Sequence, residues 1–168
     1  QPTLPANSAW LMGPITITAS VITAVVDKRI PSSMATARVY DVTDPLYGAT
    51  GDGVTDDTVA INTAIAAMPA GGVLYFPNGT TYLHTSYILF SGKANFRVEG
   101  NHVILRTANG VSMGNGGMRF INSTDGVIRD FVIDENRANR TCSSTDSHGV
   151  IVRNGNARLL IENVHVLG

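Results

Sequence analysis

Apolar residues within the segment 51–77 follow the spacing of one helix face. Ile61, Ala64, Ile65 and Met68 recur at i, i+3/i+4 and i+7, whereas the residues between them are small or polar. Only one face of such a helix favours burial, and a helix this short is marginal in water by itself. The pattern therefore predicts a short amphipathic helix that packs against an apolar surface.

Residues at both ends set the expected limits of this helix. Thr55 precedes Asp56 and Asp57, so a side-chain oxygen can cap the first free amides and two carboxylates meet the positive end of the helix dipole. A proline and a Gly-Gly pair then end the helix and reverse the chain into an apolar strand at residues 73–76. We predict a helix over about residues 56–68.

Beyond residue 90 the chain repeats a short apolar pattern. Three triplets align with offsets of 30 (128 − 98) and 33 (161 − 128) residues, and a segment upstream of them aligns with an offset of 32 (150 − 118). The triplets are Val98-Glu99-Gly100, Ile128-Arg129-Asp130 and Ile161-Glu162-Asn163, and the upstream pairs are Met118 with Val150 and Phe120 with Val152. Self-similarity of this length is typical of solenoids, in which each coil stacks on the next.

Each triplet ends in a residue that suits a sharp bend. Gly100, Asp130 and Asn163 belong to the residue types that most readily adopt the left-handed backbone conformation. A second apolar position follows five residues after the first apolar position of each triplet. These second positions are Val103, Ile133 and Val166. We therefore expect two strands in each unit, joined at a bend.

Alternation along the strands assigns side chains to an inner and an outer face. The inward positions are Met118, Phe120, Ile128, Phe131 and Ile133 in one coil and Val150, Val152, Ile161, Val164 and Val166 in the next. The outward positions are Arg119, Arg129 and Val132, together with Ile121 and Ile151. All inward positions are apolar, so stacked parallel strands would enclose one core.

The first 36 residues form a separate segment. Residues 1–26 carry no charged side chain, and residues 9–26 are apolar enough to raise the question of a membrane span. A Gly-Pro pair and interleaved threonines interrupt this run, so we expect no membrane span. We predict that residues 1–36 are an extended apolar arm and linker that packs on a partner, and that residues 37–168 form the repeating domain.

The run GDGVTDDTVAINTAIAAM, followed by GGVLYFPNGTTY, resembles the opening of pectate-lyase-superfamily proteins, especially those of phage tailspikes. The resemblance covers about residues 38–168. It implies an all-β fold: a right-handed single-stranded parallel β-helix whose N-terminal end is capped by a short α-helix, here preceded by the extended apolar arm. The superfamily includes lyases, hydrolases and non-catalytic binders, so the resemblance implies the fold and leaves the activity open.

Charge and cysteine content argue against several classes of function. Twelve basic and thirteen acidic residues are scattered without runs and give a net charge of −1, which argues against nucleic-acid binding. Cys142 is the single cysteine, so no intramolecular disulfide can form. We expect no cofactor and no metal site, because no Cys/His ligand spacing occurs and Asp52, Asp56 and Asp57 lack the EF-hand pattern.

Acidic residues on the outer face or at turns are the candidates for sugar chemistry. They are Glu99, Asp125, Asp130, Asp134, Glu135, Asp146 and Glu162. Glycosidases use two carboxyl groups about 5–9.5 Å apart across the sugar. Asp134 and Glu135, which open the loop after the second repeat, are the candidate catalytic pair, with a solvated loop start as the simpler interpretation. Asp130 is expected to serve the bend.

Asp146, His148 and Arg153 are the candidate substrate-binding residues. His148 is the one histidine with polar groups nearby in the sequence that could assist proton transfer. The histidines other than His148 are expected mostly at outward strand positions. They are His84, His102 and His165.

These observations together predict an extracellular protein of the phage virion. We expect a homotrimeric tailspike or tail-fibre component that recognises a host surface polysaccharide and contacts other tail proteins through residues 1–36. Whether its full-length form also depolymerises that polysaccharide stays open, with catalytic residues expected beyond residue 168, where the repeat is in mid-pattern. Two alternatives also stay open: a secreted pectate-lyase-like lyase or hydrolase, and a non-catalytic structural anchoring module of a virion fibre.

Overall fold

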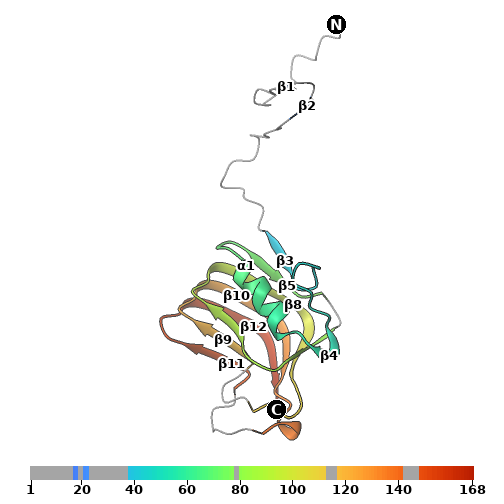
Figure 1. Ribbon diagram of the computed structural model, residues 1–168. Coiled ribbons are helices and arrows are strands. Elements are labelled where there is room, and N and C mark those ends of the chain that lie inside the picture. Colours follow the sequence, from blue (N-terminus) through green and yellow to red (C-terminus); the bar gives the residue numbers. More distant parts are fainter. Residues whose placement is uncertain (1–16, 19–20, 23–37, 78–79, 113–116, 142–147) are drawn as a thin grey trace. The chain divides into compact units, whose positions relative to one another are not determined.

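The structure is a computed structural model that describes residues 17–18, 21–22, 38–77, 80–112, 117–141 and 148–168 (Figure 1). The chain divides into two units, Gln1–Thr36 and Ala37–Gly168. In the first unit, β1 (Ile17–Thr18) and β2 (Val21–Ile22) pair antiparallel. The rest of the predicted arm, with the contacts expected of it, lies outside the described residues.

The second unit begins with short strands and one α-helix; from β7 on, short and long strands alternate, with a short 3-10 helix near the end. The elements are β3 (Val39–Asp41), β4 (Asp52–Asp56), α1 (Thr58–Ala67), β5 (Val73–Tyr75), β6 (Thr81–His84), β7 (Ile88–Ser91), β8 (Ala94–Thr107), β9 (Met118–Ile121), β10 (Thr124–Asp134), η2 (Arg137–Asn139), β11 (Val150–Arg153) and β12 (Ala157–Leu167). Within the described residues, no helix has the length and hydrophobicity that a membrane span requires.

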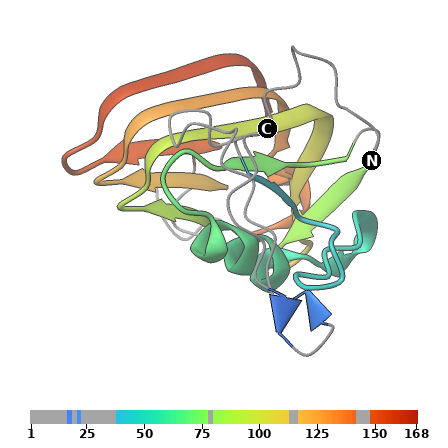
Figure 2. The ribbon, with the colours of Figure 1, turned by 90° about the horizontal axis from the view of Figure 1, so that it is seen from above.

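The strands of the second unit stack into two parallel sheets. One sheet has the order β12-β10-β8-β5-β3, with β6 beside β8 and β4 beside β6, and the other has the order β11-β9-β7. Every strand pair of this unit is parallel. Figure 2 shows the long strands β8, β10 and β12, coloured yellow to red, bending and running beside one another. The predicted all-β fold, a parallel β-helix with one short α-helix, is confirmed.

The register of the coils follows the repeat in the sequence. Ile128 pairs with Val98 on one side and with Ile161 on the other, as the 30- and 33-residue offsets predict. Met118 pairs with Val150 and Phe120 with Val152, as the offset of 32 predicts. Equivalent residues of successive coils therefore form continuous columns across the sheets.

The bends confirm two of the three predicted bend residues. Asp130 and Asn163 have φ values of 62° and 49°, in the left-handed region. In the first repeat, however, the left-handed residues are Asn101 and His102 and not Gly100. Gly100 is needed for close packing instead, because a Cβ at this position would lie 2.3 Å from the carbonyl oxygen of Asp130.

The longer first bend also shifts the second apolar positions. Val103 pairs with Phe131, and not with Ile133 as the five-residue spacing predicted. The register shifts between Arg129 and Phe131, because the first coil has the three residues 100–102 where the second has only Asp130. The number of residues between the triplet and the next inward residue therefore differs between coils. Residues of successive coils still pair in continuous columns.

The inward face of the second repeat is buried as predicted. Met118, Phe120, Ile128, Phe131 and Ile133 are all at most 1% exposed. The aromatic rings at the centre also contact one another across coils. Phe120 stacks on Phe90 with ring centroids 4.8 Å apart, and Phe76 meets Phe131 edge to face at 5.2 Å. One contiguous hydrophobic core fills the β-helix.

The predicted inner face of the third repeat is buried only in part: Val150 and Val164 pack half-buried against the core. Val152, Ile161 and Val166 are 49%, 37% and 53% exposed, because within the described residues β11 and β12 have a neighbouring coil on one side only. Ile151 was predicted to face outward and is 7% exposed. It shares a column with Arg119, and side chains of one column in a parallel sheet contact each other, so an outer-face position can be buried as well.

The helix is shorter than predicted and is capped differently. It starts at Thr58 and has 10 residues, because Asp52–Asp56 forms β4. Asp57 occupies the N-cap position without a side-chain capping bond, and its carboxylate accepts hydrogen bonds from the backbone amides of Thr50 and Gly51. The predicted cap, Thr55, instead bonds the side chain of Asp52. Hydrogen bonds to a preceding turn thus replace the capping that the local sequence predicted.

The apolar face of the helix packs as predicted. Ile61, Ala64, Ile65 and Met68 are buried in the common core, and α1 contacts β3 and β7. Asn62 fastens the helix to β7: its Nδ2 donates to the carbonyl of Tyr87 and its Oδ1 accepts from the amide of Leu89. The helix is thereby anchored on the β-helix by apolar and polar contacts together.

Candidate functional site

The two candidate catalytic carboxylates lie at the end of β10 and face different surroundings. Asp134, 20% exposed, pairs with Nε of Arg106 at 2.8 Å. Glu135, the next residue, is 2% exposed and forms an ion pair with the fully buried Arg140. Successive residues of an extended chain point to opposite faces. The structure therefore does not bring these two carboxylates together across one substrate site.

The candidate substrate-binding residues are only partly described. His148 and Arg153 are exposed, at the two ends of the segment that contains β11. Asp146 lies outside the described residues. Among the residues that the structure describes, no group of three or more His, Cys, Asp or Glu side chains is arranged to hold a metal ion.

A polar groove lies beside Asp134, on the outer side of β4, β6 and β8. It has a volume of about 390 Å³ and is lined by Gly53, Val54, Leu83, Arg106, Ala108 and Asn109. Leu83, Arg106 and Asp134 are neighbours in one column of the sheet, so the guanidinium and the carboxylate stand next to each other along the groove. The groove thus combines an ion pair and a side-chain amide with the apolar side chains of Val54 and Leu83.

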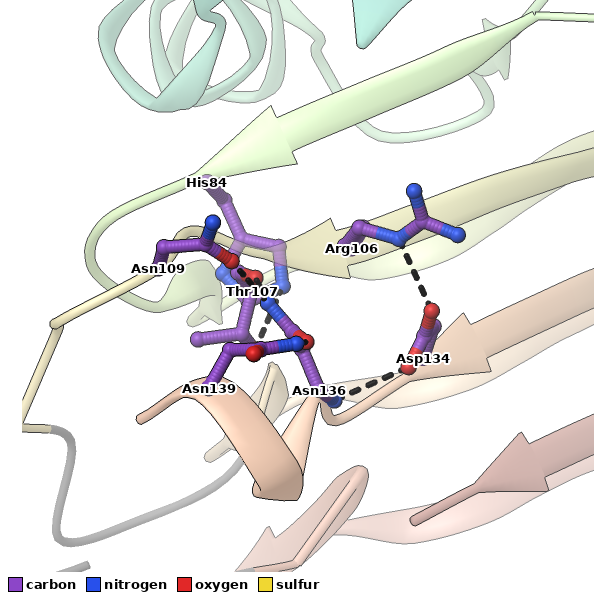
Figure 3. A network of polar contacts seen from close by, with 7 residues as sticks. All are labelled: His84, Arg106, Thr107, Asn109, Asp134, Asn136 and Asn139. Atoms are coloured by element: carbon purple, nitrogen blue, oxygen red, sulfur yellow. Dashed lines mark hydrogen bonds and ion pairs between the residues drawn. The ribbon is translucent and has the colours of Figure 1, made fainter. Parts of the chain in front are cut away.

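Asn136 holds the two loops beside the groove together (Figure 3). Its backbone is left-handed, with φ of 50°, and its backbone N–H donates to Oδ1 of Asp134 at 2.9 Å. Its side-chain Nδ2 donates to the carbonyl of Thr107 at 2.9 Å and to Oδ1 of Asn109 at 2.8 Å. Asn139 in turn donates to Oδ1 of Asn136. This network fixes the position of Asn109 at the edge of the groove.

His84 is buried beneath this network, contrary to the outward position predicted for it. It is 0% exposed, its Nδ1 lies 3.2 Å from the carbonyl oxygen of Ser86, and its Nε2 lies 3.4 Å from Oγ1 of Thr107. Burial lowers the pKa of His84 to about 4, since removal from water disfavours the imidazolium; nearby Asp56 and Glu135 oppose this shift and Arg140 adds to it. The imidazole is therefore neutral at physiological pH.

Acidification is expected to weaken the fold through His84. The unfolded imidazole takes up a proton below pH 6.5 and the folded one only near pH 4, so stability is fully present above pH 6.5 and falls as the pH drops between these values. The loss is about 3 kcal/mol at most, from 1.36 kcal/mol per pKa unit. Urea titrations at several pH values should show this slope in the wild type and not in His84→Gln. His148→Gln, an exposed control, should retain it, and equal slopes in all three proteins would contradict the assignment.

The outer face carries a column of charged side chains that the sequence analysis does not predict. Glu99, Arg129 and Glu162 are in register on β8, β10 and β12. Arg129 donates through Nε to Glu99 and lies 3.9 Å from Glu162, and the hydrogen bond to Glu99 is the main reason that the pKa of Arg129 is raised. The aligned triplets already contain these residues at their second position, so the offset could have revealed the column.

The groove beside Asp134 suits the binding of a sugar better than its cleavage. Arg106, Asp134 and Asn109 offer planar donors and acceptors that match neighbouring hydroxyl groups, and Val54 and Leu83 offer an apolar surface for a sugar ring. Asp134 is held in its ion pair with Arg106. A glycosidase needs a second carboxyl group across the sugar, and Glu135 is instead buried against Arg140.

Known proteins similar to this chain are polysaccharide-related and phage-related. A capsule KN3-specific depolymerase of Klebsiella phage KN3-1 is 32% identical over 146 residues, which is 74% of this chain and 17% of the depolymerase. The A-module of the mannuronan C-5 epimerase AlgE6 of Azotobacter vinelandii has a TM-score of 0.57 and 27% identity, over 76% of this chain and 37% of that one. The chain thus spans about a sixth of the depolymerase and about a third of the epimerase module.

A phage protein shares the fold at lower identity. ORF18 of Geobacillus virus E2 has a TM-score of 0.55 and 24% identity, over 85% of this chain and 31% of that one. The family model described as rhamnogalacturonase A/epimerase, pectate lyase-like, matches residues 40–166, which contain the capping helix and all three repeats. The chain belongs to this pectate-lyase-like family of parallel β-helix proteins.

Proposed function

We propose that this chain is part of a phage tailspike or tail-fibre protein and contributes to the recognition of a host cell-surface polysaccharide. The observation that carries the proposal is the groove beside Arg106 and Asp134, on a β-helix that is 32% identical to a phage capsule depolymerase. In this proposal the protein belongs to the extracellular tail of the virion. Residues 1–36 attach it to other tail proteins, and it assembles as a homotrimer.

A non-catalytic role of this chain is the second candidate, and the ion pairs favour it. Asp134 pairs with Arg106, and Glu135 is buried against Arg140. With both candidate carboxylates held in this way, the chain itself would bind polysaccharide without cleaving it, and any cleavage would be a property of a full-length protein.

Two matched variants test whether polysaccharide binds in the groove. Val54, 80% exposed, lines the groove, and Val59, 75% exposed, lies on α1 outside the groove lining. Val54→Arg is expected to fill the groove and weaken binding to a recognised capsular polysaccharide by about tenfold, equal to about 1.4 kcal/mol. Val59→Arg adds the same charge and should leave the affinity unchanged. Calorimetry against a panel of purified bacterial capsules would measure both.

The same samples distinguish the remaining parts of the proposal. Failure to bind any capsule of a broad panel, or equal binding by both variants, would contradict a role of the groove in recognition. Light scattering should give three times the 17.8 kDa chain mass, and a stable monomer would exclude the homotrimer. Release of reducing ends or unsaturated sugars by this chain would overturn the non-catalytic role.

A further inference from the structure

A second cleft lies between α1 and β7, with lining residues distinct from those of the groove beside Asp134. It has a volume of about 470 Å³. Residues that line it include Asn62 of the helix and Ser86, Tyr87, Leu89, Ser91 and Lys93 of the β7 segment. The two serines and Leu89 are exposed, whereas Tyr87 and Lys93 are half-buried. Among the described residues, no carboxylate lines this cleft.

Lys93 brings a positive charge to the cleft, and it has no carboxylate partner among the residues that the structure describes. Its Nζ donates to the carbonyl oxygens of Met68 at 2.8 Å and Ala66 at 3.3 Å, at the C-terminal end of α1. An ammonium group has three donors, so one remains after these two contacts. Partial burial lowers the pKa of Lys93 from its usual value. An anionic ligand would offset this loss of hydration.

Arg119 adds a second cation beside the same cleft. Its guanidinium lies over the ring of Tyr87, 3.8 Å from the ring centroid, and it is the register partner of Leu89 on the neighbouring strand. Nε of Arg119 is buried and has no hydrogen-bond partner among the described residues. By contrast, Arg106, Arg129, Arg140 and Arg158 all form ion pairs with carboxylates.

The positive charges, apolar side chains and serine hydroxyl groups at this cleft together indicate the chemical class of its ligand. We propose that the cleft between α1 and β7 binds a carboxylate-bearing sugar unit of a surface polysaccharide. Lys93 and Arg119 attract the carboxylate, Tyr87 and Leu89 contact the apolar face of the sugar ring, and the serine hydroxyls reach its hydroxyl groups. Asn62 fixes the position of this strand beside the helix, because its amide bonds the backbone of Tyr87 and Leu89. The inference rests on the proposed function and adds a site and a ligand class to it.

Titration of the 168-residue chain with glucuronate tests this site directly. Saturable shifts of the backbone NMR signals of Leu89 and Lys93 are expected with glucuronate, and not with glucose. Added salt should weaken the binding, since the attraction is between charges at a partly exposed site. Lys93→Met keeps the apolar stem but should reduce the affinity about tenfold, and Lys93→Arg should retain it. Arg119→Met is the second variant, because it leaves intact the hydrogen bonds of Lys93 to the carbonyl groups at the end of α1.

The outcomes separate this inference from the proposed function. Equal shifts with glucose and glucuronate, unchanged affinity in folded Lys93→Met and Arg119→Met, or binding of inorganic phosphate but not of glucuronate would overturn the sugar-acid site. If a polysaccharide binds through the groove at Val54 while glucuronate leaves Leu89 and Lys93 unshifted, only this inference fails. If glucuronate binds this cleft and no polysaccharide binds the groove at Val54, the role of the groove in the proposed function is refuted and the sugar-acid site stands.

Discussion

Phe120→Ala is expected to destabilise the protein by about 3–5 kcal/mol. Phe120 is fully buried, and its ring packs nearly parallel to those of Phe90 and Phe96, with centroids 4.8 and 6.4 Å away. Removing it leaves a cavity at the centre of the β-helix, which the stacked strands can close only by moving several coils. Urea titration should show a lower midpoint at an unchanged slope.

Val152→Ala is the matched control for this change. Val152 is the register partner of Phe120 on the next coil but is 49% exposed. Truncating it should therefore cost less than about 1 kcal/mol. Similar losses for the two variants would contradict the assignment of the core to the columns around Phe120.

Glu135→Gln is expected to cost about 3–5 kcal/mol of stability, because it removes the negative charge that pairs with the buried guanidinium of Arg140. Glu135 and Arg140 are at most 2% exposed, so solvent cannot replace the lost interaction. Thermal unfolding followed by circular dichroism would measure the loss. The result would show that this candidate catalytic residue serves the fold.

Asp134→Asn provides the control at the neighbouring position. The pair of Asp134 with Arg106 is partly exposed, at 20% and 42%, and such pairs contribute about 0–1 kcal/mol. A small effect at Asp134 and a large one at Glu135 are therefore expected. A Glu135→Gln protein as stable as the wild type would refute the structural role of the pair.

The candidate site could be predicted from the sequence only in part. Asp134 was selected as a loop-opening carboxylate, and it does stand beside the groove. Its partner Arg106 comes from the preceding coil, and Asn109 is held by Asn136 across 27 residues of sequence. Such contacts depend on which loops stack on each other. The local sequence of either loop does not contain that information.

The cleft between α1 and β7 shows the same dependence on tertiary structure. Lys93 reaches carbonyl groups of a helix 25 residues earlier, and Arg119 meets Tyr87 only because β9 stacks on β7. His84 is buried because it shares the inner face of β6 with Tyr82, two residues earlier. Its polar side chain gives no sign of this burial in the sequence, because its contacts with Ser86 and Thr107 form only in the folded chain.

The sequence alone determined the fold, the helix face and the register of the coils, because these follow from repeated apolar positions that only parallel stacking can bury together. The pairing of Val98, Ile128 and Ile161 is the clearest case. Tertiary structure decided the start of α1 at Thr58, the exposure of Val152 and the separation of Asp134 from Glu135. Each of these depends on hydrogen bonds or contacts with residues distant in the chain, whose positions exist only once the coils are stacked.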